Sequence, residues 1–163
     1  TISSVASKII EIEAPISKKL LMKKVLSAWE IARGGSRVEE IFSNAVARVD
    51  KNITKDEDIE FFWNKNQSSE HYSSFRVADA EGNKRSMDDI PSEEIINAII
   101  EVLKEQVSIS DVELVHETAK KFSFLRLGSI IENSVSYATR RGISRGILLK
   151  LDNGNIILNE NKQ

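Results

Sequence analysis

ISKKLLMKKVLSAWEIARGGSRVEEIFSNAVAR at residues 16–48 and ISDVELVHETAKKFSFLRLGSIIENSVSYATRR at residues 109–141 are the two stretches that decide the fold. Shifted by 93 positions, they align without a gap, and ten of the 33 aligned positions are identical. The identical pairs include Leu21/Leu114 and Gly35/Gly128. An ungapped match of this length predicts that the chain contains an internal duplication.

Each copy has the pattern of three helices followed by a β-hairpin. In the first copy we expect helices over 2–11, 17–29 and 36–50, and a hairpin that pairs 59–63 with 75–79 around a polar tip, 64–74. In the second copy we expect helices over 93–105, 111–122 and 129–142, and a hairpin of 147–151 with 156–158. The prediction is therefore an α+β fold, mainly α with small β-hairpins, built from tandem duplicated winged-helix-like units. Unit 1 spans 1–79, a linker spans 80–91, and unit 2 spans 92–163.

Local signals refine the ends of these elements. Ser110 and Ser129 are each followed by Glu three residues later, which predicts capping boxes. Gly142 is expected to end the last helix. Asn153-Gly154 predicts a type I′ turn in the second hairpin. In the first hairpin Phe61 and Trp63 are expected to be buried against the helices.

Composition narrows the classes of function. The chain has no cysteine, which excludes disulfides, thiolate zinc sites and a cysteine nucleophile and fits a cytoplasmic location. His71 and His116 stand alone, so we expect no metal site, and neither a phosphate-binding loop nor a catalytic triad motif occurs. We expect no enzyme activity, cofactor, small-molecule substrate or membrane contact. The chain begins at Thr1 rather than Met, so we expect a fragment of a larger protein.

Charge is distributed unevenly along the chain, although the net charge is only −2. Residues 120–150 hold seven basic residues and one acidic residue, and residues 18–51 hold eight basic and four acidic residues. Between them, residues 54–105 hold six basic and thirteen acidic residues. Positive charge thus falls on the second and third helices of each copy, the elements that face DNA in winged-helix proteins. A solvated helix face would show the same charge run, so this alternative is open.

These positions supply the candidate nucleic-acid-binding residues. They are basic residues of the two copies and one tyrosine that could stack on a base. The candidates are Arg33, Arg37, Arg126, Tyr137, Arg140, Arg141, Arg145 and Lys150.

The two copies share the motif Arg-x-Gly-Ser-x-x-Glu at 33–39 and 126–132. A phosphate site at a helix N-terminus would explain it, and so would a capping box preceded by a tight turn. Arg33 and Arg126 are open to two interpretations, as phosphate ligands or as buried partners of a carboxylate. A ligand site on the surface would be expected to keep its charged neighbours in both copies. Arg37 and Glu40 are instead replaced by Ile130 and Asn133 in the second copy, so we favour the structural role.

Several short motifs resemble one family. Glu13-Ala14-Pro15-Ile16, Trp29, Arg33-x-Gly35-Ser36-Arg37-Val38, Phe62-Trp63 and Ile90-Pro91 resemble an uncharacterised bacterial domain, although Ser17 stands where many members carry His. That domain lies near the C-terminus of very large superfamily I DNA helicase-like proteins that often carry a Vsr- or RecB-like nuclease domain.

The resemblance implies a bacterial DNA-processing or defence protein. Our leading hypothesis is a non-catalytic, DNA-binding accessory domain of such a parent. The rival hypothesis is a protein–protein docking module of the same parent, without nucleic-acid contact, because the acidic middle of the chain would repel DNA.

Overall fold

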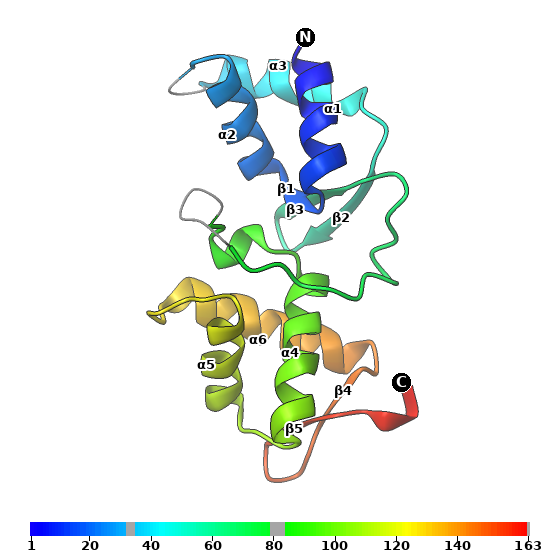
Figure 1. The fold of residues 1–163 in the computed structure, drawn as a ribbon, viewed down its shortest axis with the longest axis vertical. Coiled ribbons are helices and arrows are strands. Elements are labelled where there is room, and N and C mark those ends of the chain that lie inside the picture. Colours follow the sequence, from blue (N-terminus) through cyan, green and yellow to red (C-terminus); the bar gives the residue numbers. More distant parts are fainter. Residues whose placement is uncertain (32–34, 79–83, 163) are drawn as a thin grey trace. The chain divides into compact units, whose positions relative to one another are not determined.

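The computed structural model describes residues 1–31, 35–78 and 84–162. Contacts divide the chain into two compact units, Thr1–His71 and Tyr72–Gln163. The described elements are six α-helices with short antiparallel strands, so the predicted α+β class, mainly helical, is confirmed. In each unit two helices lie side by side and a third crosses them (Figure 1). None of the helices described is long and apolar enough to cross a membrane.

Unit 1 consists of three helices and a three-stranded sheet. Its elements are α1 (Ile2–Glu13), β1 (Ile16–Ser17), α2 (Lys18–Ala28), α3 (Ser36–Ala47), β2 (Asn52–Asp56) and β3 (Ile59–Trp63). The Thr1 hydroxyl accepts a hydrogen bond from the Ser4 amide at the start of α1, and the Ser17 hydroxyl caps α2 by accepting one from the Leu20 amide at 3.0 Å. Apolar side chains of the helices meet β1 and β3 in one core: Ala6, Ile10, Ile16, Leu21, Val25, Phe42, Val46 and Phe62.

The sheet of unit 1 corrects the predicted hairpin. β3 pairs with β2 and with β1, both antiparallel, and not with residues 75–79. The connection is the tight turn Glu57-Asp58, in which Glu57 adopts a positive φ of 54°. Its acidic sequence lacks the Gly that marks such turns, which is why the pairing was missed. Phe61 and Trp63 are buried, as predicted, but the side chain of β3 that joins the core with the helices is Phe62. The Trp63 indole donates to the Thr54 hydroxyl at 2.8 Å.

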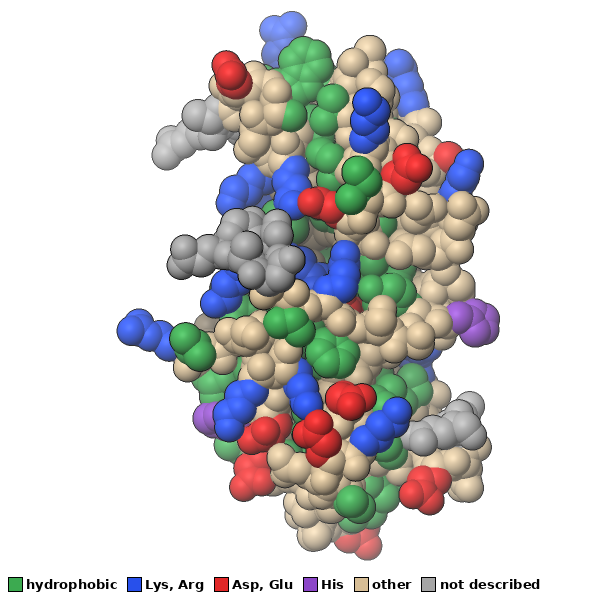
Figure 2. Space-filling view, in the orientation of Figure 1, with side chains coloured by type: hydrophobic (Ala, Val, Ile, Leu, Met, Phe, Trp, Pro, Cys, Tyr) green, Lys and Arg blue, Asp and Glu red, His purple; other side chains and the backbone are tan. Residues whose placement is uncertain are grey.

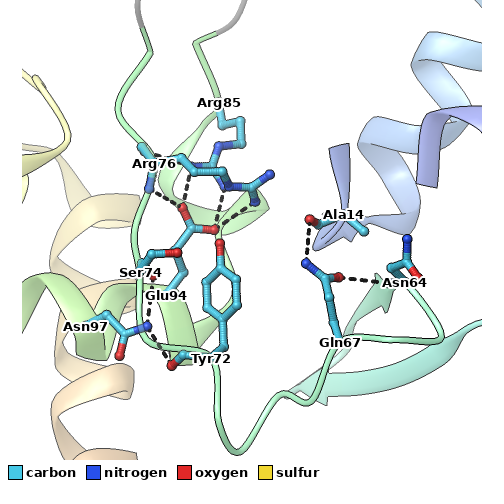
Figure 3. Close-up of polar contacts among 9 residues, drawn as sticks. All are labelled: Ala14, Asn64, Gln67, Tyr72, Ser74, Arg76, Arg85, Glu94 and Asn97. Atoms are coloured by element: carbon cyan, nitrogen blue, oxygen red, sulfur yellow. Dashed lines mark hydrogen bonds and ion pairs between the residues drawn. The ribbon is translucent and has the colours of Figure 1, made fainter. Parts of the chain in front are cut away.

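The segment after β3, predicted as the polar tip of a hairpin, is held by hydrogen bonds. The side-chain oxygen of Gln67 accepts a hydrogen bond from the backbone N–H of Asn64 at 2.9 Å. The side-chain nitrogen of Gln67 donates one to the Ala14 carbonyl at 3.0 Å (Figure 3). The side-chain nitrogen of Asn52 donates a hydrogen bond to the backbone carbonyl of Gln67 at 3.0 Å. These bonds fasten residues 64–67 to the sheet and to the end of α1.

Unit 2 has the same kinds of element. They are η2 (Met87–Asp89), α4 (Ser92–Gln106), α5 (Asp111–Lys121), α6 (Ser129–Ser144), β4 (Leu148–Lys150), β5 (Ile156–Leu158) and η3 (Glu160–Lys162). β4 pairs antiparallel with β5, and Ile109 forms an isolated antiparallel bridge with Ile156. The core gathers apolar side chains of all three helices and both strands, together with Met87 and Ile90 from the segment before α4.

A buried ionic cluster attaches the segments around Arg76 and Arg85 to α4. The Glu94 carboxylate is fully buried and accepts hydrogen bonds from Arg85 at 2.6 Å and 2.9 Å and from the Arg76 side chain at 2.9 Å (Figure 3). The Asn97 amide group donates to the carbonyls of Tyr72 and Ser74. Residues 72–78 therefore pack with unit 2, whereas the sequence placed the end of unit 1 at residue 79 and a linker at 80–91.

The end of α6 and the turn of the second hairpin differ from the predictions. α6 continues past Gly142, which is buried against Leu148: a Cβ on Gly142 would lie 2.6 Å from the Leu148 Cδ1 atom. Gly142 therefore permits close packing, and Gly146, at φ 76°, follows the helix end. In the hairpin turn the Gly154 backbone N–H donates a hydrogen bond to the Leu151 carbonyl. A type I′ turn needs positive φ at both Asn153 and Gly154, but only Gly154 of this pair has it, so the turn is not type I′.

The two units correspond residue by residue along most of their helices. α2 and α5 coincide under the 93-residue shift, α3 and α6 begin at corresponding residues, and Ser17 and Ser110 cap α2 and α5 in the same way. The Ile16–Phe62 pairing in unit 1 has its counterpart in the Ile109–Ile156 bridge. The order of the three helices and of the last two strands is thus the same in both units.

One buried position differs in polarity between the units and yields a prediction. The Thr118 hydroxyl is fully buried in α5 and has no hydrogen-bond partner within the described chain, while the corresponding residue of unit 1 is the buried Val25. Thr118→Val keeps the side-chain shape and removes an unsatisfied hydroxyl, so we expect it to raise the free energy of unfolding by about 1 to 2 kcal/mol. Urea denaturation measures the change. A loss of stability would indicate that the hydroxyl has a partner in solution.

Candidate nucleic-acid interface

The outward face of α6 brings three side chains suited to nucleic acid onto one surface. α6 buries Ile131, Val135, Ala138, Thr139 and Gly142 and packs against α4 and α5. With 3.6 residues per turn, Asn133, Tyr137 and Arg140 fall on the opposite side. Asn133 and Arg140 are exposed, and Tyr137 is half-buried. The remaining outward residues are uncharged: Ser129, Ile130, Ser136 and Ser144.

This face carries no carboxylate. The acidic residue of α6, Glu132, follows the buried Ile131 and lies on the flank of the helix. Asn and Tyr side chains can donate hydrogen bonds to base edges or accept them, Arg can donate them, and Ser can contact phosphates or bases. The face therefore offers hydrogen-bonding groups and one cation without a carboxylate beside them.

Tyr137 and Arg140 form a pair on this surface. The Arg140 guanidinium carbon lies 6.0 Å from the centre of the Tyr137 ring, within the range of a cation–π interaction. An aromatic ring and a planar guanidinium can each stack on a base, and the contact between them limits the conformations of both side chains. The predicted candidates Tyr137 and Arg140 are thus brought together.

Arg126 and Arg145 lie near the two ends of the same helix. Arg126 is exposed in the α5–α6 connection, two residues before the N-cap Gly128, and no carboxylate pairs with its side chain in the described part of the chain. Exposure excludes the buried structural role that we favoured for it. Arg145 is half-buried at the C-cap of α6.

Two further candidates of unit 2 are engaged in ionic contacts within the fold. The Arg141 guanidinium donates to the Ser92 hydroxyl at 2.9 Å and lies 3.8 Å from the buried Glu93 carboxylate, so it joins α6 to α4. Lys150 lies 3.3 Å from the Asp111 carboxylate, which reduces its positive charge toward a ligand. On the face drawn in Figure 2, basic and acidic side chains are interspersed. The positive charge of residues 120–150 is thus partly neutralised within the fold.

Unit 1 does not repeat the surface of α6. The residues that correspond to Asn133 and Arg140 are Glu40 and Ala47 on α3. Arg37 is exposed in the first turn of α3, and Arg33 lies outside the described residues. The β2–β3 turn is acidic, because Glu57 and Asp58 form it. The candidate interface therefore belongs to unit 2.

The shared Gly-Ser motif does not form the predicted capping box. Gly35 and Gly128 are the N-caps of α3 and α6, and neither helix start has a side-chain cap hydrogen bond. The backbone is extended at both glycines, so that Ser36 and Ser129 become the first helical residues instead of the caps. At Ser110 the prediction is confirmed in part, because its hydroxyl accepts from the Glu113 amide at 3.3 Å.

Asn133 is the residue of this face that the sequence analysis missed. It lies four residues before Tyr137 and seven before Arg140, a spacing that places all three on one side of a helix. The signal was therefore present, but a search restricted to basic and aromatic side chains does not find an uncharged amide.

Comparison with known proteins gives one match. A family described as a protein of unknown function (DUF3320) matches residues 1–40, which run from α1 into the first turns of α3. No curated protein and no solved structure matches the chain. The match supports an uncharacterised domain family for this part of the chain, in agreement with the resemblance seen in the sequence.

Proposed function

We propose that the chain consists of two winged-helix-like units that arose by duplication. The order helix, strand, helix, helix, strand, strand occurs in unit 1, with the sheet order β1-β3-β2. Unit 2 follows the same order when Ile109 is taken as the first strand. The coincidence of α2 with α5 and of the Ser17 and Ser110 caps under one constant shift supports a common origin.

Nucleic-acid binding through α6 is the function that this geometry supports best. The observation that carries the proposal is the carboxylate-free outward face of α6, with Asn133, Tyr137 and Arg140 together. In a helix-turn-helix arrangement the second helix of the motif enters the major groove, and α6 holds that position in unit 2. The exposed Arg126 adds a phosphate contact near the helix N-terminus.

Fluorescence anisotropy with labelled DNA tests this proposal. We expect the protein to bind duplex DNA at low salt with micromolar or tighter affinity and to lose affinity steeply as salt rises, because bound arginines release counterions from phosphates. Arg140→Ala should weaken binding about tenfold, the loss expected for one good base or phosphate contact. Arg126→Ala should weaken binding and lower the salt slope by about one while leaving the melting temperature unchanged.

Lys104→Ala is the matched control, since Lys104 is an exposed cation on α4 of the same unit. It should leave DNA affinity almost unchanged. Equal losses for Lys104→Ala and Arg140→Ala would indicate non-specific attraction and contradict a defined interface on α6. Absence of binding to both duplex and single-stranded DNA at tens of micromolar would contradict the proposal as a whole.

In the cell this activity would belong to a non-catalytic accessory domain that positions a larger parent protein on DNA. The context comes from the resemblance to domains near the C-terminus of superfamily I helicase-like bacterial proteins, and the family match over residues 1–40 is compatible with it. We place such a parent in the cytoplasm.

A protein-docking role is the second candidate, favoured by apolar side chains at the α5–α6 connection. Leu125 is 95% exposed and Ile130 is 51% exposed. Ile130 borders a shallow hollow with Met87 and Phe124. Exposed apolar residues beside a hollow are typical of protein contacts. The substitution Leu125→Ser distinguishes the roles, because it should preserve DNA affinity if the arginines and Asn133 carry the binding.

A further inference from the structure

The two units differ in how one corresponding face is covered. In each unit the second helix ends in an aromatic residue, Trp29 after α2 and Phe122 after α5, and the next residue has positive φ. Two residues after the aromatic cap the backbone turns back in the same way: the Ile31 amide donates to the Leu26 carbonyl at 2.9 Å, and the Phe124 amide donates to the Ala119 carbonyl at 3.0 Å. The backbone thus presents corresponding side chains in both units.

In unit 2 the segment that precedes α4 covers the Phe122 part of this face. The Phe75 ring packs edge-on against Phe122, with ring centres 5.5 Å apart, and Phe122 is only 4% exposed. The Lys84 ammonium lies over the Phe124 ring at 5.3 Å. Met87 is buried next to Phe124 and Ile131. Phe75, Lys84 and Met87 thus supply an aromatic anchor, a cation and a second apolar side chain to this part of the core.

In unit 1 the corresponding side chains are open. Trp29 is 49% exposed and Ile31 is 42% exposed, whereas Val38, which corresponds to Ile131, is half-buried. Trp29 thus leaves its indole in water at the position where unit 2 buries the Phe122 ring. This is unusual, because burial of a large aromatic side chain is among the strongest apolar contributions to binding.

We propose that the Trp29–Ile31 face of unit 1 is a docking site for a peptide segment with an aromatic anchor, equivalent to residues 72–78 and 84–91 of unit 2. The inference rests on the proposed correspondence of the two units and concerns a surface separate from the α6 residues. The occupant places its aromatic ring against Trp29 and its second apolar side chain near Ile31 and Val38. A cation in the segment is favourable because aromatic faces attract positive charge.

A labelled synthetic peptide with the sequence of residues 72–91 provides the probe, and fluorescence anisotropy with the full chain measures its binding. We expect saturable binding that weakens at least about tenfold when the peptide carries Phe75→Ser or the protein carries Trp29→Ala. Binding should also protect Trp29 from acrylamide quenching. Trp63 is fully buried and contributes little to quenching, so the signal reports on unit 1.

The control variant is Ile12→Ala, which removes an exposed apolar side chain from α1 of the same unit. It should leave peptide affinity unchanged, and melting curves establish that both protein variants are folded. No binding up to about 1 mM peptide, or equal binding to the wild-type protein and Trp29→Ala, would overturn the proposal. Either result would leave DNA binding by α6 unaffected, because that is measured with different variants and a different ligand.

Discussion

Glu94→Gln is expected to lower the free energy of unfolding of unit 2 by about 3 to 5 kcal/mol, the cost of breaking a buried ion pair. The Glu94 carboxylate is fully buried, and the Arg85 side chain bonded to it is only 14% exposed. Without the carboxylate charge, Arg85 stays buried with an uncompensated charge. Arg76 loses a partner too, although its guanidinium is partly in water. The segment 72–78 should therefore loosen first.

The pKa of Glu94 predicts how this contribution depends on pH. Burial alone would raise the pKa, but the hydrogen bonds and charges of Arg85 and Arg76 outweigh burial, so the pKa of Glu94 lies below its ordinary value of 4.5. A lowered pKa in the folded state means that the stabilisation is complete above pH 4.5 and is lost as pH falls through the folded value. The stability difference between wild type and Glu94→Gln should accordingly be constant near pH 7 and shrink in acid.

Chemical denaturation at pH 7 and at pH 3 to 4 measures both effects. Glu101→Gln is the matched control, because Glu101 is exposed on the same helix and should change stability by less than about 0.5 kcal/mol. If Glu94→Gln cost no more than Glu101→Gln at pH 7, the cluster would contribute nothing to holding Arg76 and Arg85 on α4.

The helices could be predicted from the sequence, because their signals are local. Apolar spacing and the caps at Ser17 and Ser110 lie within a few residues of each other, and the helix limits agreed to within a few residues. Strand pairing is not local. β2 lacks a clear alternation of apolar and polar residues, and its turn is acidic, so nothing in residues 52–58 identified the true partner of β3. The sequence likewise predicts a helix end at Gly142, because the close packing of Leu148 against this glycine is visible only in the structure.

The candidate site could be predicted in part. Tyr137 and Arg140 were both named as candidates, and their spacing of three residues within a single helix puts them on one face. Which cations are available for binding depends on contacts between elements. Arg141 pairs with α4 through Ser92 and Glu93, and Lys150 lies beside Asp111 of α5. Sequence spacing contains no information on these partners.

The identical leucines of the two copies provide the second large effect. Leu21 on α2 and Leu114 on α5 occupy corresponding positions, and both are almost fully buried. Leu→Ala at either position removes three buried carbon atoms and leaves a cavity, so each change should cost about 2 to 5 kcal/mol. If the units share one architecture, the two cavities have similar walls, and the two costs should agree within about 1 kcal/mol.

Hydrogen exchange measured by mass spectrometry assigns each loss to a unit, because local opening energies differ along a chain. Leu21→Ala should reduce the protection of α1, α2 and α3, whereas Leu114→Ala should reduce that of α4, α5 and α6. Val112→Ala is the control, since Val112 is 70% exposed on α5 and its loss should leave protection unchanged. If Leu114→Ala cost several kcal/mol and Leu21→Ala almost nothing, the two leucines would not be structurally equivalent. The duplication would then explain the sequence match but not the packing of unit 1.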